Sequence, residues 1–243
     1  MKPFLLLATR AQDKAADEEY AAFLRFGGLE PGQLHRVRLE AGPLPAVDLD
    51  RYSGIILGGS PFTASDPPES KSGVQLRVEA ELMDLVERVT AADFPFLGAC
   101  YGIGTLGRLR GGQVDGQFGE PISAVDVELA DGAVSDPLLA GVPQRFKAFA
   151  GHKEACSVLP AGAVRLAGSA ACPVHMFRLG SNVYATQFHP ELDEDGLVTR
   201  ISVYRNAGYF PPDEADEVVA SVRGHEVHVP QLILRNFVRR YGS

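Results

Sequence analysis

An apolar segment near the middle of the chain reads Phe94-Pro95-Phe96-Leu97-Gly98-Ala99-Cys100-Tyr101-Gly102. Its strand-like residues end in Gly-x-Cys-x-Gly, and small residues with helical spacing follow, which is the pattern of a nucleophile elbow with cysteine as the nucleophile. Such a sharp turn strains the cysteine backbone and leaves no space for a Cβ atom two residues before and after it. The alternative is a buried structural cysteine beside two turn glycines. The stretch therefore predicts a catalytic Cys100 above the end of a buried strand.

Strand-like and helix-like segments alternate around this stretch. Residues 4–9 and 54–57 are short apolar runs typical of buried strands, and the periodicity of residues 73–91 predicts a helix. This order favours a flavodoxin-like α/β fold, in which a mostly parallel sheet carries helices on both faces. Gly58-Gly59 and Cys100 both follow predicted strands, so they should meet at the carboxyl edge of the sheet, where ligands bind.

The second half of the chain has a different character. Residues 122–129 alternate between polar and apolar side chains, and residues 174–188 predict a hairpin around Gly180-Ser181-Asn182. We therefore expect a small antiparallel extension of the sheet, followed by C-terminal helices. No repeat or linker divides the chain, which predicts a single domain over residues 1–243. Its core would span about 1–192 and its C-terminal helical extension about 193–243.

Composition limits the classes of function. The 243 residues are 45% apolar and 22% charged, which is ordinary for a globular protein. A net charge of −8 argues against nucleic-acid binding, and no apolar stretch is long enough to span a membrane. Since no signal-peptide pattern is present either, a cytoplasmic protein is expected. Three cysteines and no paired metal-ligand spacing predict no disulfide framework, no metal and no other cofactor.

A cysteine nucleophile needs a base, and the base needs an orienting group. His189 ends a predicted strand, and Pro190 keeps it extended because the residue before proline avoids the α region. Glu191 can then accept a hydrogen bond from the imidazole. The alternative is an ordinary helix start, with proline and glutamate in its first turn. His152 is the second histidine of interest. The remaining histidines are expected at the surface: His35, His175, His225 and His228.

The elbow, followed far downstream by Thr-Gln-Phe-His-Pro-Glu, resembles the class I glutamine amidotransferases, in particular the glutaminase part of GMP synthase and its stand-alone relatives. The resemblance covers roughly the first 190 residues. It implies Cys100 as nucleophile, His189 as general acid and base, and Glu191 as orienting carboxylate. The backbone N–H groups of Gly59 and Tyr101 would form the oxyanion hole. The substrate-binding positions that it implies are Gly58, Gly104, Gly151 and His152.

The implied reaction is hydrolysis of the γ-carboxamide of glutamine through a cysteinyl γ-glutamyl thioester, which releases ammonia and glutamate. The helix that follows Cys100 should lower the pKa of its thiol. In the family the ammonia passes to a synthetase. Only some fifty residues follow His189, so a synthetase partner would be a separate chain.

Two positions depart from the family pattern. Gly104 stands where the family commonly has a glutamine that helps to hold the substrate, and residues 151–154 read Gly-His-Lys-Glu in place of a Ser-His-Gly-Asp-like segment. Both concern substrate recognition rather than bond cleavage. A second hypothesis is therefore a hydrolase of γ-glutamyl amides or peptides that uses the same Cys-His-Glu chemistry.

Two further hypotheses have less support in the sequence. A non-catalytic binding or regulatory protein could keep the fold, but all three relay residues are present. The related stress-protein and intracellular-peptidase group typically has histidine directly after the cysteine, where this chain has Tyr101. The sequence does not determine the true substrate, the ammonia acceptor, the partner, the oligomeric state or the role of the C-terminal helices.

Overall fold

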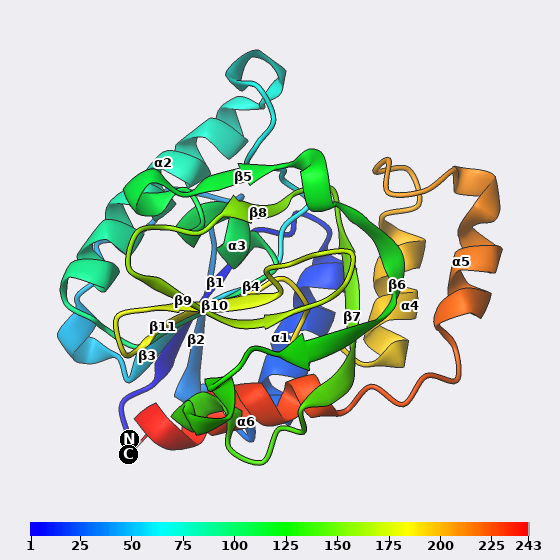
Figure 1. Ribbon diagram of the computed structural model, residues 1–243. Coiled ribbons are helices and arrows are strands. Elements are labelled where there is room, and N and C mark those ends of the chain that lie inside the picture. The colour runs from blue at the N-terminus through cyan, green and yellow to red at the C-terminus, as the bar shows by residue number, and fades with distance from the viewer. Residues whose placement is uncertain (243) are drawn as a thin grey trace.

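The computed structural model describes residues 1–242 and shows a large mixed sheet with helices packed on both faces (Figure 1). The strand order is β2-β1-β3-β4-β11-β10-β9-β6-β7. The parallel part comprises the first five strands in that order: β2 (Leu34–Arg38), β1 (Phe4–Ala8), β3 (Gly54–Leu57), β4 (Phe96–Ala99) and β11 (Val183–Thr186). The predicted α/β fold is confirmed.

The antiparallel part continues the same sheet. It comprises β10 (Met176–Leu179), β9 (Ala163–Gly168), β6 (Glu120–Leu129) and β7 (Arg145–His152). The predicted hairpin is β10–β11, and β11 also pairs in parallel with β4, so this hairpin joins the two parts. A separate two-stranded sheet contains β5 (Gln113–Asp115) and β8 (Ala155–Val158).

The faces of the sheet are covered by different helices (Figure 1). α2 (Gly73–Ala91) and α3 (Tyr101–Leu106) cover one face, while α1 (Asp13–Gly27) and α6 (Val229–Tyr241) cover the other. Successive residues of β1 therefore enter different cores, because side chains of a strand alternate between its faces. This burial on both faces explains why β1 reads as a continuous apolar run.

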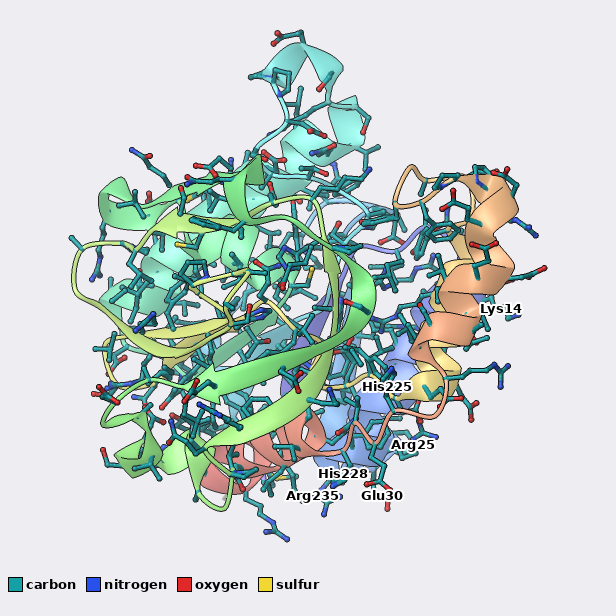
Figure 2. The ribbon with its side chains drawn as sticks, turned by 45° about the vertical axis from the view of Figure 1, so that its right-hand side comes forward. Lys14, Arg25, Glu30, His225, His228 and Arg235 are labelled. Carbon is teal, nitrogen blue, oxygen red and sulfur yellow. The ribbon has the colours of Figure 1, made fainter. Side chains whose placement is uncertain are left out.

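The C-terminal segment packs against the rest of the chain. α6 contacts β1, where the rings of Phe237 and Phe4 lie 5.8 Å apart. α4 (Glu194–Val203) and α5 (Ala215–Val222) share a third apolar cluster with Phe149 of β7. Figure 2 shows His225 and His228 on the outside of the molecule, on the chain between α5 and α6. Within residues 1–242, no helix has the length and apolar character needed to cross a bilayer.

Short 3-10 turns connect the main elements. They span Pro31–Gln33, Leu49–Arg51, Pro68–Ser70, Leu109–Gly111, Gly116–Phe118, Ala133–Ser135, Pro137–Leu139 and Pro212–Glu214.

Candidate active site

Cys100 occupies a strained turn between β4 and α3. Its φ and ψ are 51° and −76°, a conformation that costs a residue with a side chain roughly 1–3 kcal/mol. Its N–H donates to the carbonyl of Thr186 at the end of β11, at 2.7 Å, which holds the turn against the neighbouring strand. A Cβ atom at Gly98 would lie 2.6 Å from the Cα of Gly102, whereas one at Gly102 would meet no atom within 4 Å. The predicted need for glycine is thus confirmed at Gly98 and wrong at Gly102.

His189 and Glu191 form a buried pair just beyond β11. Nδ1 of His189 lies 2.9 Å from Oε1 of Glu191. Arg200 of α4 donates to the same Oε1 at 2.8 Å, and its other terminal nitrogen lies 2.9 Å from the same Nδ1. A ring nitrogen either donates or accepts, so only one of the two Nδ1 contacts is a hydrogen bond at a time. The Nδ1–H to Glu191 pairing leaves Nε2 free to accept a proton.

The charges around the pair favour a neutral imidazole. Burial and the nearby Arg200 and Arg10 cations lower the pKa of His189, although Glu191 opposes them. Burial alone would raise the pKa of Glu191, but His189 and Arg200 hold it well below its usual range. A neutral imidazole beside an ionised carboxylate is the state that can take up a proton from a nucleophile.

The thiol itself differs from the sequence prediction. Burial raises the pKa of Cys100 to about 12, and the opposing effect of Arg10 is smaller. The expected lowering by the following helix is therefore wrong, because α3 has only 6 residues and the buried thiolate loses its hydration. In this structure the resting nucleophile is a neutral thiol, and its proton must leave as the sulfur attacks.

Two small cavities meet at Cys100. One has a volume of about 60 Å³ and is lined by His189, Arg10 and Tyr204 among others. The other has about 20 Å³ and is lined by Tyr101, His152 and Glu154 among others. Ser60, Cys100, Gly151 and Tyr209 line both. The two cavities form the catalytic chamber.

The predicted glycines are placed differently from one another. A Cβ at Gly59 would lie 2.4 Å from Cε1 of His189, so this backbone approaches the imidazole directly. The Tyr101 N–H begins α3 and has no intrahelical partner. A Cβ at Gly58 would instead lie 2.7 Å from Glu19, and neither Gly58 nor Gly104 lines the chamber. Gly151 does line it, as predicted.

The space beside Gly104 is filled by Glu154. Its carboxylate accepts hydrogen bonds from the N–H groups of Ala64 at 2.9 Å and Ser65 at 2.6 Å. A Cβ at Gly104 would lie 2.6 Å from Oε1 of Glu154 and 3.0 Å from the Cβ of Ala64. The two departures from the family pattern, at 104 and 154, therefore touch each other, and one side chain occupies the volume that the other position lacks.

Sequence reasoning missed several residues of the chamber. Buried Arg10 donates to Glu19 at 2.8 Å and directly follows β1, so a charged residue at the carboxyl end of an apolar strand was an available signal. Arg200 and Tyr209 come from the C-terminal segment, and no spacing linked them to Cys100. His175 was expected at the surface and is 0% exposed, because β10 lies inside the sheet rather than at its edge.

Comparison with known proteins identifies the class. The family described as Glutamine amidotransferase class-I matches residues 33–196, which is more than half of the chain. The glutamine-hydrolyzing subunit of GMP synthase from Methanoculleus marisnigri is 34% identical over 140 residues, which cover 57% of this chain and 65% of that protein. The match thus spans less than two thirds of that relative.

Other similarities extend over the whole chain. Gamma-glutamyl peptidase 4 of Arabidopsis thaliana is 25% identical over 252 residues, covering 100% of this chain and 97% of that protein. A glutamine amidotransferase structure from Thermotoga maritima superposes with a TM-score of 0.76 at 21% identity, over 99% of this chain and 98% of the other, and shares its fold. The extent of the family match shows that the chain belongs to the class I glutamine amidotransferases.

Proposed function

We propose that the chain hydrolyses the γ-carboxamide of glutamine, or of another γ-glutamyl compound, through a thioester on Cys100. One observation carries the proposal: Cys100 stands on a strained elbow and lines the same cavity as His189, which is paired with Glu191. A nucleophile, a base and an orienting carboxylate in this arrangement are the requirements for acyl transfer.

The proposed reaction has two stages. The Cys100 sulfur attacks the carbonyl carbon while Nε2 of His189 takes the thiol proton, and Glu191 stabilises the imidazolium that forms. The oxyanion would be held by the N–H groups of Gly59 and Tyr101. The C–N bond then breaks, His189 protonates the leaving nitrogen, and a γ-glutamyl thioester remains. Water, deprotonated by His189, attacks the thioester and releases glutamate, and the thiol regains its proton.

Hydrolysis of larger γ-glutamyl amides or peptides is a second candidate. Leu197, Tyr204 and Tyr209 of the C-terminal segment line the chamber on the side of His189, where the leaving group must be protonated. The similarity to a γ-glutamyl peptidase includes this segment, whereas the similarity to the GMP synthase glutaminase covers 57% of the chain. With glutamine as substrate, the released ammonia would pass to a separate synthetase chain; with larger amides, no partner is required.

The two candidates are separated by measuring glutamate release from glutamine and from a series of γ-glutamyl amines. A higher kcat/KM for glutamine supports the first, and a higher value for substituted amides supports the second. Cys100→Ser should abolish turnover, His189→Ala should lower kcat by about 10²–10⁴-fold, and Glu191→Gln should lower it less. Cys156→Ser is the matched control and should retain activity, since Cys156 lies in β8 and does not line the chamber.

A covalent probe tests the nucleophile independently of turnover. The glutamine-like electrophile 6-diazo-5-oxonorleucine should label Cys100, detected by mass spectrometry of the digested protein. Full activity of Cys100→Ser, or labelling of Cys156 or Cys172 instead, would contradict the proposed chemistry.

A further inference from the structure

Behind the catalytic chamber lies a buried cluster of three potential metal ligands. Glu120 is the first residue of β6, and Cys172 and His175 lie in the connection between β9 and β10. One side-chain donor atom from each residue lies within 4.8 Å of the donor atoms of the other two. Cys172 and His175 are 0% exposed and Glu120 is 9% exposed. None of the three lines the chamber.

The charge of Glu120 lacks a permanent counter-ion. Its Oε2 lies 3.0 Å from Nε2 of His152 and 3.0 Å from Nε2 of His175. Within residues 1–242, these imidazoles are its only ion-pair partners, and no lysine or arginine pairs with it. Burying a carboxylate is unfavourable unless a positive charge accompanies it. The cluster therefore calls for a cation: either a proton on an imidazole or a metal ion.

The geometry distinguishes the two histidines. Nε2 of His152 forms a hydrogen bond with Glu120, and its Nδ1 pairs with the carbonyl of Glu154 at 2.9 Å. His175 has the same 3.0 Å separation from Glu120, yet neither of its ring nitrogens has a hydrogen-bond partner. A proton shared by His175 and Glu120 would require their N–H and oxygen to be aligned. Two donor atoms that are close but not aligned on each other can instead point at a common third atom.

We propose that Glu120, Cys172 and His175 bind a structural Zn²⁺ ion, with a water in the fourth position. Thiolate, imidazole and carboxylate are its usual ligands, with bonds of about 2.3 Å to sulfur and about 2.0–2.1 Å to nitrogen, so tetrahedral neighbours lie roughly 3.3–3.5 Å apart. On binding, the Cys172 S–H bond breaks, a Zn–S bond forms, and the proton leaves to solvent. One thiolate and one carboxylate then balance the double charge of the ion.

His152 would support this site from outside the ligand set. A hydrogen bond to a ligating carboxylate fixes its orientation. Because His152 also pairs with the Glu154 carbonyl, the ion would brace the end of β7 and the start of β8, from which Gly151 and Glu154 reach the chamber. The inference rests on donor geometry and charge, and it stands or falls separately from the proposed reaction.

The test is a Co²⁺ titration of the full chain after chelator treatment, followed by displacement with Zn²⁺. Wild type should bind one equivalent of Co²⁺ and show a cobalt–thiolate charge-transfer band that Zn²⁺ removes. Cys172→Ser should lose the band. Cys156→Ser and Cys100→Ser should keep it, and Cys156 is the closest control because it is equally buried. Absence of the band in wild type, or its survival in Cys172→Ser, would overturn the proposal.

A second measurement covers the case in which Cys172→Ser does not fold. Zn²⁺ should raise the Tm of wild type, because it binds only the folded chain, and should not raise that of His175→Gln. Glu120→Gln separates the metal from a protonated histidine: it removes the buried charge, so it should weaken the Tm response to Zn²⁺ without lowering the Tm of the metal-free protein. An equal Zn²⁺ response in wild type and His175→Gln would count against the site.

Discussion

Gly104→Ala is expected to destabilise this protein, although alanine normally stabilises a helix. Gly104 lies inside α3, where replacing glycine by alanine usually adds roughly 0.5–1 kcal/mol of stability. Here the new Cβ would lie 2.6 Å from a carboxylate oxygen of Glu154 and 3.0 Å from the Cβ of Ala64. The sign of the effect therefore depends on whether Glu154 can move.

The hydrogen bonds of Glu154 restrain it. Its two oxygens are held by backbone N–H groups at 2.9 Å and 2.6 Å, and such bonds to a charged acceptor contribute about 1.5–3 kcal/mol each. Overpacking a close-packed site costs about 1–3 kcal/mol, which exceeds the gain in helix propensity. We expect a net loss of about 1–2 kcal/mol, which lowers the Tm of a chain of this size by roughly 2–8 °C.

The measurement is urea and thermal unfolding of four variants. Gly102→Ala is the matched control in the same helix, because its Cβ would meet no atom within 4 Å, and it should be neutral or stabilising. In a Glu154→Ala background, Gly104→Ala should regain its stabilising sign. If Gly104→Ala is as stable as Gly102→Ala in the wild-type background, the contact with Glu154 does not limit this position; if the loss persists without Glu154, Ala64 is its cause.

Three further outcomes follow from the chamber. Gly59→Ala should abolish hydrolysis, because its Cβ would lie 2.4 Å from Cε1 of His189 and displace the imidazole; wild-type turnover would contradict this. Arg200→Met removes a cation that lowers the pKa of His189, so the acidic limb of the kcat/KM profile should move to higher pH, and an unchanged limb would show that burial alone sets this pKa. Alkylation of Cys100 by iodoacetamide should still accelerate as the pH rises past 9.0, the ordinary thiol value; a plateau at lower pH would show that the thiol is activated before substrate binds.

The sequence alone determined the parallel half of the sheet and the catalytic pair. Continuous apolar runs such as Phe4–Ala8 and Gly54–Leu57 mark strands buried on both faces, and that signal is local. The elbow around Cys100 and the order His189-Pro190-Glu191 are also local, since a strained turn and an extended histidine depend on adjacent residues.

Only the tertiary structure decided the environment of these residues. The raised pKa of Cys100 comes from burial, which depends on chain segments distant in sequence, and outweighs the helix that the sequence made visible. Arg200 reaches Glu191 from α4, and Glu154 fills the space at Gly104 from the far side of the chamber. His175 is buried because β10 pairs on both sides. Spacing along the chain carries no information about such contacts, because their geometry exists only after the sheet and helices have packed together.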